Sequence, residues 1–400
     1  MRILHTGDWH LGRIFYARHL TEDQAYVLEH QFLSLLKEAQ IDVVIIAGDV
    51  YDRAVPPVEA VELWDMVLAK VALELKIPVL VIGGNHDSAE RLEINKDLLS
   101  PMGVHIWGRM NRALAPLCLE DATGPVYFCP FPFTEPRSVK HELEVLQAKL
   151  EAEGTLSEPI VDTDVVAEYG ATYAAWSCYM QSTVPLGARA VAMAHVMVAG
   201  SETSASERPL VIGGSSNINV QVFTPFQYTA LGHIHRAQKM GCESIRYSGS
   251  PLKYSFDEAH HKKSFTIVDL GPDGTVSIEE VPIKPLHDVV VLEGRFDDLL
   301  LNADLQAQHK EDYILFRLTD TAPVLDGMAR LRAAYPLAMS LELTGRLVQE
   351  KEAKDVQYKQ LSEQELFEQF TQAVRSEPLS AEEHQYISGL WERILKEDKG

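Results

Sequence analysis

Seven side chains of the kinds that bind transition metals stand in five short segments of the sequence. In chain order they are Asp8, His10, Asp49, Asn85, His195, His233 and His235. Carboxylate and amide oxygens combined with imidazole nitrogens, without sulfur, suit manganese, iron or zinc. Seven ligands are too many for one ion that must keep a position open, whereas two ions that share a carboxylate use them naturally. The sequence therefore predicts a site for two divalent metal ions.

The spacing inside two of the segments favours paired ligands. In an extended chain the side chains at positions i and i+2 point the same way. Asp8 with His10, and His233 with His235, can therefore present paired groups to the metal ions. Glycines lie beside several of the segments, and the lack of a Cβ lets the backbone turn sharply there and lets a phosphate come close.

Other polar residues near these segments are expected to play different parts. Asn85 and His86 are neighbours, so one of them can bind metal while the other addresses the substrate. We expect Asp52 and Asp87 to orient loops or histidines, as carboxylates beside metal ligands commonly do. His5 is expected to be an ordinary strand residue.

Each segment taken singly has a purely structural explanation. Asp8 or Asp49 could be a turn residue or a helix N-cap. His195, which ends an apolar stretch, could be a hydrogen-bonded histidine of the core. All five segments in this order, each after an apolar run, are hard to explain by packing, and the set therefore favours the metal site.

The elements that must position these residues alternate along the chain. Apolar runs that end in short turns predict buried strands at 2–7, 41–48, 77–84, 188–195 and 228–232. Amphipathic stretches at 22–39 and 57–75 predict helices between the first three strands. The order is that of a layered α/β domain, in which the carboxyl ends of strands form a binding crevice.

Turn residues at 271–274, followed by Pro282 and Pro285, predict a boundary after the first domain. We expect domains at 1–280, 281–346 and 347–400. The second is a small α/β unit with strands at 287–292, 313–318 and 339–343 and helices at 297–308 and 324–334. The third is a helical hairpin whose helix starts carry capping boxes at Ser362 and Ser380. An acidic helical insertion, 138–179, is given no chemistry.

Composition narrows the classes of protein that fit. With 36 Lys and Arg against 58 Asp and Glu, the formal net charge is −22, so the protein does not coat nucleic acid through its overall charge. Four scattered cysteines indicate neither a disulfide framework nor a thiolate zinc site, and a reducing cytosol fits best. The chain has neither a signal-peptide pattern nor an apolar run that could cross a membrane. A cytoplasmic protein is expected.

A basic segment follows directly after the last two metal ligands. Between Arg236 and Lys263 there are six Lys or Arg, and four of them, Arg236, Lys239, Arg246 and Lys253, are candidates for binding substrate. A solvated loop surface is the structural alternative. A positive strip beside a phosphate-cleaving site is also what binding to a nucleic-acid backbone requires.

At these residues the chain resembles the calcineurin-like metallophosphoesterase superfamily. The resemblance lies in Asp8-Trp9-His10, Gly48-Asp49, Gly84-Asn85-His86-Asp87, His195 and Gly232-His233-Ile234-His235, and it covers residues 1 to about 268. The stretches 8–12, 48–53, 200–208 and 247–251 resemble more closely the nuclease subunits of bacterial DNA-repair complexes. Relatives from archaea and eukaryotes usually have histidine at the position of Asp52.

The resemblance implies a ligand set and a fold. One ion would be held by Asp8, His10, Asp49 and His235, and the other by Asp49, Asn85, His195 and His233, with Asp49 as the bridge. His86 would contact the scissile phosphate. The fold would be a four-layer sandwich of two stacked sheets flanked by helices, followed by a small capping domain and C-terminal helices, and the ions would be manganese.

The resemblance also implies an activity and partners. The chain would be a two-metal DNA nuclease in an ATP-dependent complex that acts as a double-strand exonuclease and a single-strand and hairpin endonuclease in repair and recombination. A metal-bridging hydroxide would attack the phosphodiester. The chain would form a homodimer within a heterotetramer, and its C-terminal helices would bind an ATPase subunit.

Two other classes of function remain open at this point. A phosphatase or nucleotidase would use the same ligands, and a scaffold would tether DNA ends without cutting them. The intact ligand set counts against the scaffold. The appended domain and terminal helices count against an enzyme for small molecules, whereas the polarity of cleavage is left undecided by the sequence.

Overall fold

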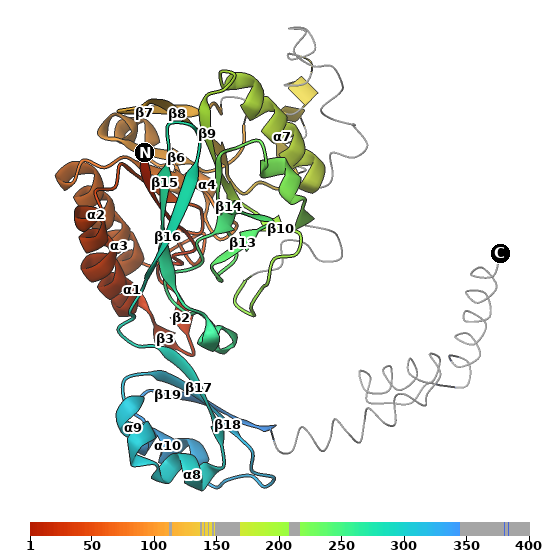
Figure 1. The fold of residues 1–400 in the computed structure, drawn as a ribbon. Helices are drawn as coiled ribbons and strands as arrows, with labels where there is room; N and C mark the ends of the chain where they lie inside the picture. Colours follow the sequence, from red (N-terminus) through yellow and green to blue (C-terminus); the bar gives the residue numbers. More distant parts are fainter. Residues whose placement is uncertain are drawn as a thin grey trace. The chain divides into compact units, whose positions relative to one another are not determined.

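The chain is described from a computed structural model, drawn as a ribbon in Figure 1. The structure describes residues 1–111, 114–136, 138, 139, 141, 142, 144, 145, 148, 169–207, 217–344, 380 and 383. The chain divides into two compact units. The first comprises 1–290 with 311–313, and the second comprises 291–310 with the chain from 314 onward.

The first sheet of the first unit has parallel strands at its centre. Its strands, in spatial order, are β16 (Val276–Pro282), β15 (Ser264–Leu270), β1 (Arg2–Thr6), β4 (Val43–Ile46), β5 (Val79–Ile82) and β6 (Val104–Trp107). From β1 to β6 the neighbours are parallel, whereas β15 and β16 are antiparallel additions. Every residue of β4 and β5 is buried, which is why these strands are unbroken apolar runs rather than alternating ones.

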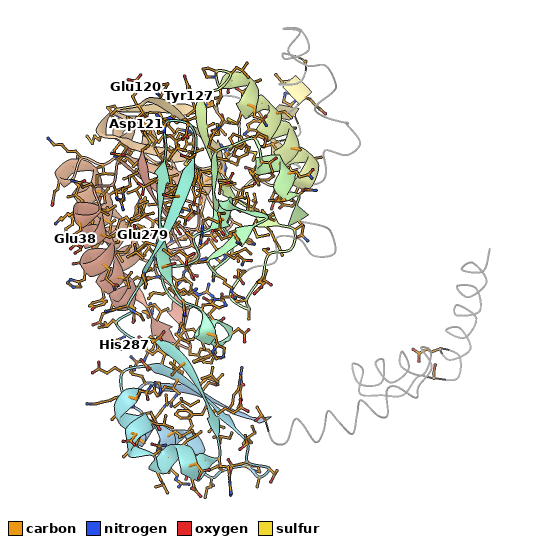
Figure 2. The ribbon with its side chains drawn as sticks, viewed as in Figure 1. Glu38, Glu120, Asp121, Tyr127, Glu279 and His287 are labelled. Atoms are coloured by element: carbon orange, nitrogen blue, oxygen red, sulfur yellow. The ribbon has the colours of Figure 1, made fainter. Side chains whose placement is uncertain are left out.

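The second sheet also has six strands and a parallel centre. In spatial order they are β13 (Gln238–Met240), β14 (Cys242–Tyr247), β12 (Tyr228–Gly232), β9 (Arg189–His195), β8 (Gly124–Phe131) and β7 (Leu117–Asp121). The two outer strands pair antiparallel with their neighbours. The bidentate pair of Arg189 and Asp121 joins the start of β9 to the end of β7, and Figure 2 shows Asp121 at one end of this unit and His287 at the other.

The core of the first unit lies between the two sheets. One cluster of buried apolar side chains combines Ile3, Val43, Ile45, Leu80 and Ile82 of the first sheet with Val126, Phe128, Val191, Met193, Tyr228 and Ala230 of the second. A second cluster packs α7 (Tyr169–Thr183) on the second sheet, with Tyr173, Trp176 and Met180 fully buried.

Helices cover the outside of the sandwich. The helix α1 (Thr21–Val27) continues through the π-helical turn η1 (Leu28–Phe32) into α2 (Leu33–Glu38), and α3 (Val58–Leu68) continues into the π-helical turn η2 (Ala69–Glu74). Phe32 packs against Phe265 of β15, with 5.6 Å between the ring centroids. These helices lie on one side of the unit and α7 on the other, so the four-layer sandwich predicted from the sequence is confirmed (Figure 1).

Short elements complete the first unit. They are β2 (Ile14–Phe15), β3 (Arg18–His19), α4 (Ala89–Leu92), α5 (Lys96–Leu99), η3 (Ser100–Met102), β10 (Met197–Val198), β11 (Asn217–Ile218), η4 (Val220–Phe223) and η5 (Phe256–His260). Several of them lie in the connections after strands, where they shape the loops that carry polar side chains.

The second unit is a small α/β fold. Its three-stranded sheet has the order β17 (Val289–Gly294), β18 (Tyr313–Leu318), β19 (Ala338–Leu343). The helices are α8 (Phe296–Leu301), α9 (Ala303–Gln308) and α10 (Gly327–Ala334). Phe316 and Tyr335 are both buried and lie 5.1 Å apart between ring centroids, which packs α10 on the sheet. The three strands and α10 agree with the predicted elements of the small domain, whereas the single helix predicted at 297–308 is divided at Asn302 into α8 and α9.

Some predictions fall on parts of the chain that lie outside the described residues. The insertion at 138–179 is described only in part, and of the predicted helical hairpin at 347–400 only Ser380 and Glu383 are described. These two form the predicted capping box, because Ser380 N donates to Glu383 Oε2 (2.8 Å) and Glu383 N donates to Ser380 Oγ (3.3 Å). Within the described residues no helix has the length and apolar character to cross a membrane.

Candidate metal centre

The side chains predicted to bind metal come together where strands of both sheets end. Asp8 and His10 follow β1, Asp49 follows β4, and Asn85 follows β5 in the first sheet. His195 is the last residue of β9, and His233 and His235 follow β12 in the second sheet. Both sheets are therefore needed to build the site, as expected for loops at the carboxyl ends of strands.

Three overlapping groups of side chains have ligand atoms within 4.8 Å of one another, and one group includes His86, which was predicted to contact the substrate. The groups are Asp8, His10, His235; His10, Asp49, His86; and Asp8, Asp49, His195. Asp49 belongs to two of them, and its Oδ2 lies 3.6 Å from Nε2 of His10 and 3.5 Å from Nε2 of His195. The position is the one that a carboxylate shared between two ions would occupy.

The backbone at the site is held in an uncommon conformation. Asp8 (φ 52°), His10 (φ 46°), Asp49 (φ 50°) and His233 (φ 102°) all have positive φ. Such angles cost non-glycine residues of order 1–3 kcal/mol each and concentrate at functional sites. The loop after β1 is held by Gln24, which is almost fully buried and whose Nε2 donates to the carbonyl oxygens of Trp9 (3.0 Å) and His10 (2.8 Å).

Two glycines next to the proposed ligands lie where a Cβ would collide with the opposite sheet. Gly48 has φ +91°, and a Cβ at this position would overlap the ring of His195. A Cβ at Gly232 would overlap the carbonyl oxygen of Ala47. The glycines of the Gly-Asp and Gly-His-x-His motifs are thus required by close approach between the two sheets.

Asn85 and His195 meet in a way that calls for a cation. Nδ1 of His195 donates to the carbonyl oxygen of Ala47 (2.9 Å), and burial lowers the pKa of His195 to about 4. The neutral ring therefore presents a lone pair at Nε2. That nitrogen lies 2.9 Å from Oδ1 of Asn85, and Nδ1 of His233 lies 3.0 Å from the same oxygen. Nε2 of His195 and Oδ1 of Asn85 both carry lone pairs and repel each other at this distance unless a cation binds both. The two side chains therefore fit a metal ion.

The other histidine pair fits a metal ion in the same way. Nε2 of His10 lies 3.0 Å from Nε2 of His235. Burial, with the charge of His235 as the next cause, lowers the pKa of His10 well below its ordinary value, and burial also lowers that of His233. Neutral imidazoles are the form that binds metal.

Burial raises the pKa values of two carboxylates at the site. Burial, followed by the charge of Asp49, raises the pKa of Asp8 well above its ordinary value. Burial raises the pKa of Asp87 to about 6, and its carboxylate accepts from the backbone N–H groups of Val50 (3.2 Å), Tyr51 (3.0 Å) and Gly84 (3.0 Å). Asp87 therefore ties the loops after β4 and β5 together, whereas a cation beside Asp8 and Asp49 would offset their mutual repulsion.

His86 lies at the edge of the cluster. Its backbone N–H donates to Oδ1 of Asp49 (2.8 Å), and its Nδ1 donates to the carbonyl oxygen of Asp52 (2.7 Å). The second bond places the proton on Nδ1 and leaves Nε2 for another partner. The Asp52 carboxylate accepts from Arg13 Nη1 (2.8 Å), so this side chain holds the loop rather than the ring of His86.

Comparison with known proteins places the first unit in a family. Residues 1–198 match the family model described as calcineurin-like phosphoesterase. The first unit therefore contains a calcineurin-like phosphoesterase domain. Residues 285–375 match a second model, described as the type 5 capsule protein repressor C-terminal domain. As a calcineurin-like phosphoesterase the chain is a metal-dependent enzyme, and divalent ions are its cofactors.

Two similar proteins have informative descriptions. The SbcD subunit of the nuclease SbcCD from Staphylococcus saprophyticus is 29% identical to this phosphoesterase over 398 residues, which cover 99% of each chain. A crystal structure of a dimetal phosphatase from Danio rerio covers 71% of this chain and 97% of its own, with 12% identity and a TM-score of 0.38.

The structure pairs the four basic candidates for substrate binding with acidic or carbonyl groups. Arg236 and Lys239 are exposed and pair with Glu202 and Glu243. Arg246 is buried and pairs with Glu280. The Nζ of Lys253 is engaged by Asp288 (2.8 Å) and by two carbonyl oxygens. Only the first two present their charges at the surface of the phosphoesterase.

Sequence reasoning missed the residues that support the ligands from behind. Gln24 lies in a predicted helix, and Glu258 and Lys263 lie in a stretch whose pattern indicated only a basic loop. Ser206 falls in the serine-rich stretch 200–208, which was noticed for its resemblance but given no role. Their contacts with the proposed metal ligands span 14 to 29 positions along the chain, so no local pattern could have paired them with those ligands.

Proposed function

We propose that this phosphoesterase is the nuclease subunit of an SbcCD-type complex, and that it hydrolyses DNA phosphodiester bonds with two divalent ions. The observation that carries the proposal is the convergence of seven buried or half-buried ligands from both sheets on one spot. The staphylococcal relative, whose description is that of an SbcCD nuclease subunit and which matches over nearly the whole length of both chains, supports DNA as the substrate.

The proposed ligand sets follow the two sides of the cluster. Asp8, His10, Asp49 and His235 would hold one ion, and Asp49, Asn85, His195 and His233 would hold the other. The mixture of oxygen and imidazole donors favours manganese. When bound, two such ions supply an activated water at neutral pH and neutralise charge on the phosphate.

The chain's own residues would orient the substrate and move a proton. His86, with its Nδ1 bonded to the carbonyl oxygen of Asp52, lies beside His10 and Asp49, where its Nε2 would contact the scissile phosphate or protonate the leaving oxygen. Arg236 and Lys239 would contact the DNA backbone next to the site, exchanging their present acidic partners for phosphates. Arg246 and Lys253 are paired with Glu280 and Asp288, so they would stabilise the basic segment 236–263 and would not contact DNA.

The remaining parts of the chain are assigned to DNA and to partners. The α/β domain at 281–346 would cap the DNA. The C-terminal helices at 347–400 would bind the SbcC-type ATPase, which would make cleavage of duplex ends ATP-dependent. An enzyme of this kind acts on the chromosome, so we place it in the bacterial cytoplasm, at the nucleoid.

A homodimer within a heterotetramer is supported by an apolar groove on the first unit. The groove has a volume of about 360 Å³ and is lined by exposed Val61, Leu73, Ile94 and Met102 together with the buried Trp64. A second copy of the chain would remove these apolar side chains from water. Ile94→Glu should convert the dimer to a monomer in light scattering, and Leu186→Glu, at an exposed residue outside the groove, should not.

One experiment separates the nuclease from a phosphatase and from a scaffold that does not cut. The purified chain is incubated with Mn²⁺ and either end-labelled duplex, hairpin and single-stranded DNA or p-nitrophenyl phosphate. A nuclease degrades the DNA and leaves the small ester nearly untouched. Preference for p-nitrophenyl phosphate would indicate a phosphatase, and no cleavage of either would indicate a scaffold. A parallel preparation of Asp49→Ala excludes contaminating nucleases.

A further inference from the structure

A buried chain of hydrogen bonds reaches His235 at the ring nitrogen that does not face His10. Oγ of Ser206 lies 2.6 Å from Nδ1 of His235 and 2.5 Å from Oε1 of Glu258. Oε1 of Glu258 also lies 3.3 Å from Nδ1 of His235. Nζ of Lys263 donates to Oε2 of Glu258 (2.5 Å). All four side chains are buried, and Glu258 has no exposed surface.

The chemical groups in this hydrogen-bonded network determine which atom donates the proton in each bond. Glu258 is ion-paired with Lys263, so its carboxylate can only accept. The single proton of the Ser206 hydroxyl must therefore be donated to Glu258, and Oγ is left to accept from His235. Nδ1 of His235 then carries the ring's proton, whether it donates to Ser206 or to Glu258.

The consequence lies at the other ring nitrogen. With the proton held on Nδ1, the neutral imidazole of His235 keeps a lone pair on Nε2, which points at the cluster and lies 3.0 Å from Nε2 of His10. The opposite tautomer would place an N–H where a metal ion must bind. A partner that sets tautomer and ring orientation raises metal affinity.

We propose that Ser206 and Glu258 are positioning residues that lock His235 in its metal-binding tautomer, with Lys263 holding Glu258 ionised. Lys263 is well placed for this role because its Nζ also donates to the carbonyl oxygen of His235 (2.7 Å) and to Oγ of Ser250 (2.8 Å). The same ammonium group thus fixes both the backbone of the ligand and the anion behind its ring. The proposal rests on the assignment of His235 to one of the two ions.

The direct test is a Mn²⁺ titration of the full chain, with free Mn²⁺ followed by electron paramagnetic resonance. Wild-type protein is expected to bind two ions. Ser206→Ala removes the hydroxyl and leaves only the longer contact of His235 with Glu258, so the ion at His235 should bind about 10-fold more weakly, within the 10- to 100-fold range for such partners. The ion at His195 and His233 should bind as in the wild type.

Ser204→Ala is the matched control. Ser204 lies in the same loop, and its Oγ contacts Ser206 (2.9 Å), Glu207 (2.8 Å) and, at the longer distance of 3.4 Å, Glu258, but not His235. Both ions should bind this variant as they bind the wild type. A structural role of the loop as a whole would instead weaken binding in the two serine variants alike.

Glu258→Gln gives a sharper test, because it exchanges donor and acceptor in the hydrogen bonds that lead to His235. Lys263 would draw the amide oxygen of Gln toward its ammonium group and leave the NH₂ group facing Ser206. Ser206 would then accept from the amide and donate to Nδ1 of His235, which moves the ring's proton to Nε2. The ion at His235 should bind about 100-fold more weakly, which exceeds the loss in Ser206→Ala.

Specific results would overturn the proposal. Wild-type affinity at both sites in Ser206→Ala would do so, and so would equal weakening of both ions in that variant. A smaller loss in Glu258→Gln than in Ser206→Ala would contradict the tautomer argument. If Glu258→Gln does not fold because Lys263 has lost its anion, Ser206→Ala, which removes no charge, decides the matter. Wild-type protein that binds fewer than two ions would instead overturn the two-metal function itself.

Discussion

The carboxylate of Asp49 lies within reach of histidines on both sides of the cluster, 3.6 Å from His10 and 3.5 Å from His195. We therefore expect Asp49→Ala to abolish DNA cleavage and to lower the metal content of the purified protein. Folding should survive, because the change removes one of two buried carboxylates that repel each other without metal. Elemental analysis after gel filtration and circular dichroism check the two parts. DNA cleavage at the normal rate in Mn²⁺ would show that Asp49 does not bridge the ions.

His86 differs from the metal ligands in its expected effect. His86→Gln keeps the backbone bond to Asp49, so both ions should remain bound. Turnover should fall about 100-fold or more, the scale of losing one general acid or one oxyanion donor. Single-turnover cleavage and metal analysis on the same sample make the measurement. If an ion is lost along with activity, His86 is itself a ligand.

At the scale of single residues, the sequence allowed the ligands to be predicted because each follows an apolar strand in a short motif. Asp8, Asp49 and His195 were predicted as members of the whole set of motifs, because each of them alone could be a turn residue or a core histidine. The residues behind them could not be predicted, because Glu258 and Ser206 act on His235 through contacts that exist only after the second sheet has formed. A pattern in sequence records what lies nearby along the chain, whereas those contacts depend on tertiary structure.

Among the elements, the hairpin of β7 and β8 is held to β9 by a bidentate ion pair. Nη1 and Nη2 of Arg189 donate to Oδ2 (2.9 Å) and Oδ1 (2.8 Å) of Asp121, which lies at the end of the first unit in Figure 2. These bonds from Arg189 hold the pKa of Asp121 well below its usual range. The ionised carboxylate therefore stabilises the fold at neutral pH.

Asp121→Asn should lower the free energy of unfolding by about 1–2 kcal/mol at pH 7, the range for a charge-assisted pair near the surface. Because the folded pKa is lowered, the stabilisation is present above the unfolded value of about 3.9 and is lost as the pH falls through the folded value. The difference between wild type and variant should thus shrink below about pH 4. Urea titrations at pH 7 and pH 3.5 test this, with Glu120→Gln, an exposed neighbour, as the control. A difference that stays constant with pH would contradict the assignment.

The five strands that end beside the proposed site were predicted, whereas the inner strands β8, β14 and β15 and the outer strands of both sheets were not. β4 and β5 are buried along their whole length and stand out as unbroken apolar runs. β16 alternates between half-buried and exposed residues, and β13 has three residues, so neither contrasts with a loop. The two π-helical turns were also missed, since they keep the apolar spacing of the α-helices that they interrupt.

At the scale of the whole molecule, the tail at 378–400 offers a test of partner binding. Its sequence carries an apolar stripe with Trp391, and isolated helices of this length are marginal in water, so the stripe must pack on something larger. Deletion of 378–400 should leave a soluble protein that still cuts short single strands with Mn²⁺. Association with the ATPase partner and ATP-stimulated cutting of duplex ends should be lost, as co-purification and nuclease assays would measure.

The outcomes of this deletion are distinguishable. Normal co-purification of the truncated chain with the ATPase partner would exclude the tail as the docking element. An insoluble product would indicate that the tail packs on the chain's own second domain. Soluble protein that has lost only the partner supports docking through the deleted segment, with Trp391 as its expected anchor and Phe370, upstream of the deletion, as a second expected anchor.

The proposed ligands follow strands of two separate sheets, and this has a thermodynamic consequence. Asp8, Asp49 and Asn85 follow strands of the first sheet, whereas His195 ends β9 and His233 follows β12 in the second, so an unfolded chain cannot assemble the site. Ions that bind only the folded state stabilise it by mass action, by about 2.7 kcal/mol per ion at 100 times the dissociation constant. The melting temperature of the first unit should therefore rise with Mn²⁺ concentration and fall when EDTA is added. The ions would thus act as a reversible cross-link between the two sheets, and a chelator that removes them would lower the stability of the fold together with the activity.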